Sequence, residues 1–175
     1  AEDDMLVRMS LRSRIDWCVH GIELLDDAID GQDALQKITA GNPDIVILDI
    51  GMPILNGIQV IHRLNELGFQ GKIIVLSCHD DYENVKEALK QGAMDYLVKH
   101  LIQPQNLLDA LLLAIEGLKQ AVLENLQKKQ DEEINLISYE VLREEYLKDL
   151  VKGRIITDLE AAERMKKVNI KMSFS

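Results

Sequence analysis

The sequence predicts an α/β fold in which a doubly wound parallel sheet is covered by helices on both faces. Two continuous apolar runs, 45–48 and 73–76, are rich in β-branched residues, which is typical of strands buried on both sides. Amphipathic segments separate these runs, which implies right-handed crossovers between parallel strands. A hydrophobic content of 47% with 4% aromatic residues suits an aliphatic core, and 175 residues suffice for one domain and a further segment.

The expected elements alternate between helix and strand along the chain. In order, they are a helix at 5–15, a strand beginning at 22–25, a helix at 31–40, a strand at 45–49, a helix at 58–67, a strand at 72–77, a helix at 82–91, a strand at 95–99 and a long helix opened by Pro104. Gly92 suits the residue after a helix end, and Pro104 suits the first turn of a helix. The acidic residues at 2–4 lie where a first strand should end, so we expect most of that strand to be missing ahead of Ala1.

Four polar residues fall at the predicted carboxyl ends of strands: Asp3, Asp49, Ser77 and Lys99. In open α/β sheets these ends share one edge, where ligands and chemistry gather. Alone, Asp49 would be explained as a cap or an Asx-turn acceptor. Together, two carboxylates and a loop carbonyl form an oxygen site suited to Mg²⁺, while a lysine and a hydroxyl bind anionic oxygens. An aspartate nucleophile in such a site would be covalently phosphorylated.

Four sequence motifs occur at these strand ends in a specific combination. They are Glu2-Asp3-Asp4, Asp49-x-x-Met52-Pro53-x-x-x-Gly57, Val75-Leu76-Ser77 and Asp95-Tyr96-Leu97-Val98-Lys99. With these motifs, residues 1 to about 117 resemble a receiver domain of two-component response regulators, which has the chemotaxis-type flavodoxin-like fold. The resemblance implies a five-stranded parallel sheet in the order 2-1-3-4-5, followed here by a helical extension.

The resemblance also implies a Mg²⁺ site built around a phosphoacceptor. Asp49 corresponds in position to the phosphoacceptor. Glu2 and Asp3 match the acidic pair, with Asp3 as the direct metal ligand and Glu2 acting through water. The backbone carbonyl of Gly51 matches the third protein ligand. The implied metal site is therefore formed by Glu2, Asp3, Asp49 and Gly51.

Three further residues match the receiver's catalytic and switching positions. Ser77 matches the switch hydroxyl, Tyr96 the switch aromatic residue and Lys99 the phosphate-binding lysine. The resemblance thus implies a catalytic set of Asp49, Ser77 and Lys99, a switch pair of Ser77 and Tyr96, and a sensor histidine kinase as partner.

Two positions depart from the receiver pattern. Receivers usually follow the lysine with a proline in a cis peptide, whereas this chain has His100 there. A cis bond before a non-proline residue costs about 3 kcal/mol, so either a trans bond reshapes the loop or packing holds a strained bond. Gly51 is smaller than the residue often found two places beyond the acceptor, and it either suits the turn or leaves room for water.

Residues 118–175 are predicted to form a helical connector or dimerisation extension. Apolar positions of the first helix follow steps of three and four: Leu108, Leu111, Ile115, Leu118 and Val122. A polar run at 127–133 precedes a second predicted helix at 138–152, and Thr157 begins a third. A bare apolar face packs on its own receiver, on a twin chain or on another domain, and we expect the twin chain, which gives a homodimer. This region resembles, more weakly, the connector of regulators that end in an AraC-type helix-turn-helix output domain.

The leading functional hypothesis is a receiver module that takes a phosphoryl group on Asp49 from a histidine kinase and switches a downstream output such as transcription. The alternative is a receiver-like dimerisation or interaction module that does not use phosphate, and His100 and the expected loss of most of the first strand keep this alternative open. We expect no enzymatic activity beyond Mg²⁺-dependent self-phosphorylation and self-dephosphorylation. A dehalogenase-type phosphatase would need a second acid where Gly51 stands, and a flavin carrier would need a phosphate-binding loop at the acidic residues 2–4.

Composition limits the partners and the compartment. A net charge of −10 argues against direct nucleic-acid binding by these residues, so DNA would be bound only through an output domain absent from the sequence. Cys18 and Cys78 match no metal or redox spacing, which favours reduced thiols in a cytoplasmic protein. The sequence contains no signal peptide and no apolar run long enough to cross a bilayer.

Overall fold

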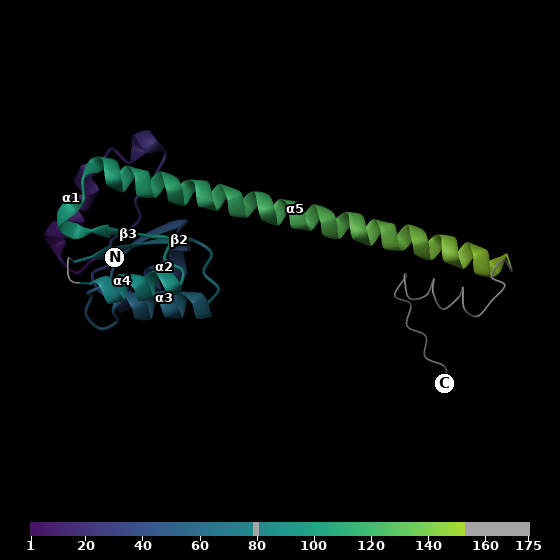
Figure 1. Cartoon of the computed structure of the whole chain (residues 1–175), viewed down its shortest axis with the longest axis horizontal. Helices are drawn as coiled ribbons and strands as arrows, with labels where there is room; N and C mark the ends of the chain where they lie inside the picture. The colour runs from purple at the N-terminus through teal and green to yellow at the C-terminus, as the bar shows by residue number, and fades with distance from the viewer. Residues whose placement is uncertain (79–80, 153–175) are drawn as a thin grey trace. The chain divides into compact units, whose positions relative to one another are not determined.

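Figure 1 shows the computed structural model, which describes residues 1–78 and 81–152. The chain separates into two compact units, Ala1–Ala121 and a second unit that begins at Val122. The first unit contains the sheet and every residue of the predicted site.

A parallel sheet of three strands lies at the centre of the first unit. Its strands follow the order β1-β2-β3, with β1 at Ile45–Asp49, β2 at Lys72–Ser77 and β3 at Asp95–Val98. The register pairs Asp49 with Leu76 and Ser77 with Val98, so the carboxyl ends of all three strands lie at one edge. The strands predicted at 45–49, 72–77 and 95–99 are therefore confirmed, the last of them one residue shorter.

Helices cover both faces of this sheet. In chain order they are α1 (Met5–Arg14), the short 3₁₀ helix η1 (Cys18–His20), α2 (Gly31–Gly41), α3 (Gly57–Glu66), α4 (Tyr82–Lys90), the short 3₁₀ helix η2 (Lys99–Leu101) and α5 (Pro104–Val151). Figure 1 shows α2, α3 and α4 together on one side of the sheet, and α1 with the start of α5 on the other. The helices predicted at 5–15, 31–40, 58–67 and 82–91 are confirmed to within one residue at each end.

Successive residues of β2 pack into two apolar cores, one under each layer of helices. Val75 belongs to the core under α2, α3 and α4, which includes Ala34, Val60, Ile61, Leu64 and Ala88. Leu76 belongs to the core under α1 and α5, which includes Trp17, Leu97, Leu107, Leu111 and Ala114. Because both faces of β2 are buried, its sequence is apolar at consecutive positions.

The strand predicted at 22–25 is wrong, because these residues form no strand in the structure. The place beside β1 is taken by Ala1 and Glu2. The N–H of Asp49 donates to the carbonyl of Ala1 at 3.0 Å, and the N–H of Glu2 donates to the carbonyl of Ala28 at 3.1 Å. Ala1 and Glu2 form only a short ladder of hydrogen bonds, which reaches Ala28. Residues 22–25 therefore have no strand to pair with and stay irregular.

Helix α5 is continuous over 48 residues, so the separation into two helices around 127–133 is also wrong. Gln, Lys and Glu dominate this polar run and are good helix formers, and no Gly or Pro occurs between 118 and 151. The third helix predicted from Thr157 lies outside the described residues. Within the described part of the chain, none of the helices has the length and hydropathy that crossing a membrane requires.

The buried face of α5 can be tested by a pair of neighbouring substitutions. Leu111 is 2% exposed, whereas Leu112 is 49% exposed. Leu111→Ala should lower the free energy of unfolding by about 2–5 kcal/mol, because it removes buried methyl groups and leaves a cavity. Leu112→Ala alters the same helix and should change this free energy by less than about 0.5 kcal/mol. Urea denaturation measures both variants, and equal losses would contradict this orientation of α5.

Candidate functional site

Asp49 lies at the carboxyl end of β1 and is only 1% exposed. Its N–H is bound by the carbonyl of Ala1, and the following N–H, of Ile50, donates to the carbonyl of Leu76 at 3.1 Å. The end of β1 is therefore held on one side by the first residues of the chain and on the other by β2. This backbone arrangement fixes the place at which the carboxylate of Asp49 enters the site.

The loop that follows Asp49 returns closely over the end of β1. The N–H of Gly57 donates to the carbonyl of Ile50 at 2.9 Å. A Cβ atom at Gly57 would lie 2.3 Å from the carbonyl oxygen of Asp49, so a larger residue cannot fit without moving the backbone. Asn56 begins α3 with a capping box that includes Gln59. Together these contacts set where α3 begins relative to the site.

A strained turn occurs within the same loop. Ile54 has a φ of 68°, a conformation that β-branched residues rarely adopt, and the N–H of Leu55 donates to the carbonyl of Pro53 at 2.8 Å in a γ-turn. Gly31 at the start of α2 donates its N–H to the same carbonyl at 3.3 Å. A Cβ at Gly31 would collide with the backbone of Leu55, so this loop and α2 are closely packed.

Lys99 joins two buried carboxylates. Its Nζ lies 2.9 Å from Asp49 Oδ1 and 2.9 Å from Glu2 Oε2, and it donates a hydrogen bond to Glu2 Oε1 at 3.0 Å. Glu2 is 1% exposed. Lys99 begins η2 directly after β3, and the peptide bond between Lys99 and His100 is trans, as are the others in the described ranges. Of the two geometries left open by the sequence, the structure therefore has the trans bond with a reshaped turn.

Burial and ion pairing act in opposite directions on this group of charges. Burial raises the pKa of Glu2 above its usual value, and this effect outweighs the hydrogen bond from Lys99, which lowers the pKa. Burial alone would lower the pKa of Lys99, but hydrogen bonds and charge attraction from Asp49 and Glu2 raise it overall. Lys99 is therefore charged at neutral pH, while ionised Glu2 is held in a place that disfavours its charge.

Glu2, Asp3 and Asp49 form an acidic cluster that resembles a metal site. Each offers a carboxylate oxygen, and these oxygens all lie within 4.8 Å of one another. Asp49 Oδ2 is buried and accepts no hydrogen bond from the described residues, whereas the buried Glu2 Oε2 has only the ion pair with Lys99 at 2.9 Å. A Cβ on Gly51 would lie 3.7 Å from Asp49 Oδ2, so the backbone of Gly51 borders the same oxygen. Hard cations prefer oxygen ligands of this kind, so the residues present fit Mg²⁺.

Ser77 and Tyr96 lie on neighbouring strands, where Tyr96 is paired with Val75, two residues before Ser77. Ser77 is 1% exposed at the end of β2, whereas Tyr96 on β3 is 45% exposed. Both line a cavity of about 590 Å³ along α4, together with Cys78, Tyr82, Val85, Lys86, Leu89, Lys90 and Val98. The structure therefore places Ser77 at the same sheet edge as Asp49, and Tyr96 near the start of β3, two residues before that edge and partly exposed.

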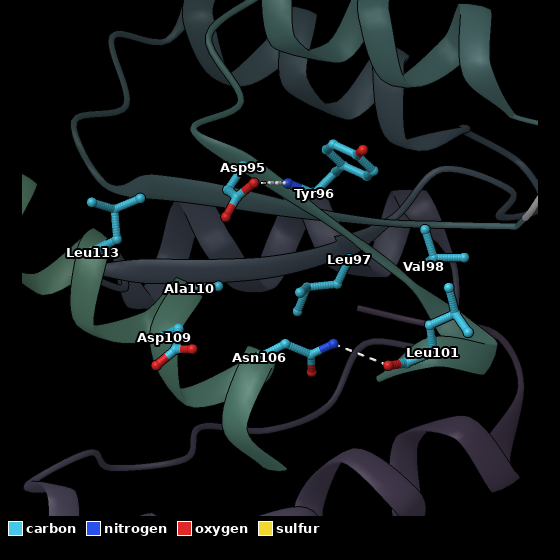
Figure 2. Close-up of a pocket in the computed structure, with 9 residues that line it drawn as sticks. All are labelled: Asp95, Tyr96, Leu97, Val98, Leu101, Asn106, Asp109, Ala110 and Leu113. Carbon is cyan, nitrogen blue, oxygen red and sulfur yellow. Dashed lines mark hydrogen bonds between the residues drawn. The ribbon is translucent and has the colours of Figure 1, made fainter. Parts of the chain in front are cut away.

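Figure 2 shows a second pocket, of about 410 Å³, between β3 and the start of α5. The ring of Tyr96 and the side chain of Leu97 lie on opposite sides of β3, as expected for successive residues of a strand. Asn106 of α5 donates to the carbonyl of Leu101 at 3.0 Å across the bottom of this pocket. Tyr96 thus stands between two hollows, one beside α4 and one beside α5.

Arg8 also belongs to the surroundings of the site, although it is not among the site residues predicted from the sequence. Its Nη1 donates to the backbone carbonyls of Glu2 at 2.6 Å and Asp3 at 2.8 Å. One signal was available, because side chains of a helix point toward its N-terminus. An arginine in the second turn of a helix that follows an acidic pair can therefore reach back over that pair.

Comparison with known proteins identifies the family. Residues 1–112 match the family described as the response regulator receiver domain. The chain belongs to this family. The resemblance inferred from the four motifs is therefore confirmed, and the receiver domain occupies most of the first compact unit.

Individual relatives of this receiver domain agree. The chemotaxis protein CheY of Thermotoga maritima is 37% identical over 110 residues, which are 63% of this chain and 89% of that protein. The nitrate/nitrite response regulator NarL of Escherichia coli K12 is 32% identical over 116 residues, 66% of this chain and 53% of that protein. A solved structure of a two component transcriptional regulator AraC from Clostridium phytofermentans is 30% identical with a TM-score of 0.62, covering 68% of this chain and 92% of that one.

These matches establish the flavodoxin-like receiver fold with a parallel sheet and covering helices. The chain spans about half the length of the first curated relatives that it matches.

Substitution of Glu2 tests the electrostatic balance of the site. Because the pKa of Glu2 is raised in the folded state, its protonation favours folding; this contribution is complete below the unfolded pKa and is lost as pH rises through the folded pKa. Glu2→Gln imitates the protonated carboxyl, so without Mg²⁺ its melting temperature should exceed that of the wild type by a few degrees at about pH 7. The difference should vanish toward about pH 4.

Thermal unfolding in EDTA across this pH range measures the effect. A variant that is less stable than the wild type at neutral pH would show that the ion pair with Lys99 outweighs the cost of burying Glu2.

Proposed function

We propose that this receiver domain accepts a phosphoryl group on Asp49 from a sensor histidine kinase, and that phosphorylation switches a downstream output. One observation supports the proposal above the others. Asp49 Oδ1 lies 2.9 Å from the ammonium group of Lys99, while Oδ2 is buried and accepts no hydrogen bond from the described residues. One oxygen is thus held by a cation, and the other has a free lone pair for nucleophilic attack.

The transfer would form one bond and break one. Oδ2 of Asp49 attacks the phosphorus atom of the donor, and the bond from phosphorus to the donor's imidazole nitrogen breaks with its electron pair going to the leaving group. The product is an acyl phosphate on Asp49, which water can hydrolyse to restore the carboxylate. Lys99 can bind a phosphoryl oxygen of this product, because its Nζ already lies within 2.9 Å of both Asp49 and Glu2.

We assign one Mg²⁺ ion to the acidic cluster. Asp3 and Asp49 would hold it directly with the carbonyl of Gly51, and Glu2 would hold it through water. A bound Mg²⁺ neutralises negative charge on the phosphoryl oxygens during transfer. Glu2 and Asp49 share the ammonium group of Lys99, and Asp3 adds a third carboxylate to the cluster, so its negative charge favours uptake of a divalent cation before an anionic donor arrives.

Ser77 and Tyr96 would transmit the phosphorylated state to the surface. The hydroxyl of Ser77 would move toward the phosphoryl group on Asp49, and Tyr96 would turn inward from its half-exposed position into the space left behind. The cavity that both residues line supports this coupling, because a rotation of Tyr96 there would change the surface along α4. The catalytic set of the proposal is Asp49, Ser77 and Lys99.

Several finer assignments extend the proposal beyond the receiver itself. A likeness to a solved two component transcriptional regulator supports an AraC-type output domain as the route to transcription and DNA.

We place the receiver at 1–117 and a connector at 118–175. The position of Ala1 and Glu2, bonded between β1 and Ala28, supports the order 2-1-3-4-5 of the receiver fold, with residues 1–2 in the place of its first strand and residue 28 in the place of its second. Cys18 and Cys78 are both free thiols, which supports a cytoplasmic location.

Phosphorylation can be tested directly by mass spectrometry of the intact chain. After incubation with acetyl phosphate and Mg²⁺, the wild type should gain the mass of one phosphoryl group, and hydroxylamine should remove it because an acyl phosphate is labile to this nucleophile. Asp49→Asn should gain nothing, since an amide oxygen is a poor nucleophile. Asp95→Asn is the matched control and should still be modified, because Asp95 begins β3 at the end of the sheet opposite Asp49. An unmodified wild type would favour the alternative, an interaction module that does not use phosphate.

The second compact unit supports the further proposal of a homodimer. Along α5, five apolar residues and one Gln follow steps of 3, 4, 4, 3 and 4, which keep them on one face: Leu123, Leu126, Gln130, Ile134, Ile137 and Val141. Each of the five apolar residues is more than half exposed. Burying one such side chain contributes about 1.5–3 kcal/mol, so a pairing of two copies of this face would offset the cost of ordering two chains.

A charge placed on this face should separate the two copies. Ile137→Asp in the full chain should give a monomer, because a buried carboxylate without a partner is costly. Leu136→Asp is the matched control, because this substitution adds the same charge to α5. Leu136 is 61% exposed and lies on a different face of the helix. Light scattering at high micromolar concentration should report a dimer for the wild type and for Leu136→Asp. A monomeric wild type would refute the dimer.

A further inference from the structure

Arg8 makes an unusual contact with the acidic pair, because it binds the backbone and not the carboxylates. One nitrogen, Nη1, donates to the carbonyl of Glu2 at 2.6 Å and to the carbonyl of Asp3 at 2.8 Å. Arg8 is half-buried on α1. Its carbonyl acceptors belong to two successive residues, so one side chain fixes two neighbouring peptide groups at once.

The two hydrogen bonds of Arg8 belong to a network that links residues 2–8 around the acidic pair. Asp4 caps α1 by accepting from the N–H of Leu6 at 2.7 Å, and its own N–H donates to Glu2 Oε1 at 3.2 Å. The N–H of Arg8 donates to the carbonyl of Asp4 at 3.1 Å, and the guanidinium then returns to the two residues before the cap. Residues 2–8 therefore hold the acidic pair against the first turns of α1.

This hydrogen-bond network explains how the carboxylates of two successive residues can both lie near Asp49. Successive side chains of an extended chain point in opposite directions, yet Glu2 and Asp3 both place a carboxylate oxygen within 4.8 Å of Asp49. This convergence requires a bend, and the chain does bend at Asp3. The carbonyls bound by Arg8 lie on either side of that bend.

We propose that Arg8 is a positioning residue for the cation site, which it serves by holding the bend that turns Glu2 and Asp3 toward Asp49. This inference rests on the proposed Mg²⁺ site. Loss of the two hydrogen bonds would let the bend relax, so that the carboxylates would have to be reordered when the cation binds. Residues that orient metal ligands in this way typically contribute a factor of about 10–100 to metal affinity.

The positive charge of Arg8 alone would have the opposite effect on Mg²⁺ affinity. The sign of the change in affinity on removing Arg8 therefore tests the inference. A guanidinium beside the acidic cluster repels a divalent cation. If charge were its main influence, removing Arg8 would tighten Mg²⁺ binding. If positioning is its main influence, removing Arg8 weakens binding despite the loss of repulsion.

Arg12 provides a matched control on the same helix. It is placed one turn after Arg8, and its Nε lies 3.0 Å from Asp27 Oδ2 while Nη2 donates to the carbonyl of Leu25 at 2.9 Å. Arg12 thus also joins α1 to the backbone of another segment, but that segment lies outside the acidic cluster. Its substitution tests whether loss of any such arginine disturbs the site.

Calorimetric titration of the unphosphorylated full chain with MgCl₂ tests the inference without any phosphodonor. Arg8→Gln should bind Mg²⁺ about tenfold more weakly than the wild type. Arg8→Lys should recover part of the lost affinity, because an ammonium group can also donate to carbonyls. Arg12→Gln should bind as the wild type does. Thermal unfolding in EDTA should show that Arg8→Gln and Arg12→Gln remain folded, so that lost affinity reflects the site.

The outcomes separate this inference from the proposed function. Arg8→Gln with unchanged or tighter Mg²⁺ binding, beside a wild type that binds normally, would overturn the role of Arg8 alone. A wild type that takes up no Mg²⁺ would overturn the cation site and the role of Arg8 together. Equal weakening in Arg8→Gln and Arg12→Gln would assign the effect to α1 as a whole and would also overturn the inference.

Discussion

Lys99 places one ammonium group between two buried carboxylates, and the arrangement of the site depends on this contact. Glu2 and Asp49 are each 1% exposed, and the Nζ of Lys99 lies 2.9 Å from both. Burying a carboxylate without a partner costs several kcal/mol, so two such groups side by side need a cation between them. The three residues come from residue 2, the end of β1 and the turn after β3, and the parallel order of the strands brings these places to one edge.

One ammonium group does not balance the carboxylates that converge on it. Glu2 has a raised pKa because burial disfavours its charge, and Asp49 retains a buried oxygen without a hydrogen bond. The fold thus keeps an unfavourable cluster at its sheet edge, where a more stable protein would have neutral side chains. Strain of this kind is common at functional sites, where a ligand relieves it. The strained turn at Ile54 lies in the loop directly after Asp49.

Much of this arrangement followed from the sequence, for a physical reason. The apolar runs of β1 and β2 predict strands buried on both faces, and parallel strands bring their ends together, so the cluster of Asp49, Lys99 and the acidic pair could be expected. The segment 22–25 could not be judged from its own residues, because a strand needs a partner along its length. The polar run at 127–133 was mistaken for a break because its lack of apolar residues hides its good helix propensity. Arg8 contacts backbone atoms, so the residue types that it contacts did not point to it, and only its place in the second turn after the acidic pair could have done so.

The central claim is that the unbalanced carboxylates at this edge hold a divalent cation beside a reactive Asp49. Mn²⁺ can replace Mg²⁺ at oxygen sites and scatters X-rays anomalously, so crystals grown with Mn²⁺ would locate the ion. The account predicts one anomalous peak within bonding distance of Asp3, Asp49 and the carbonyl of Gly51, with Lys99 still bound to Asp49. A map without a peak at this edge, or with Lys99 alone filling the cluster at saturating Mn²⁺, would contradict it.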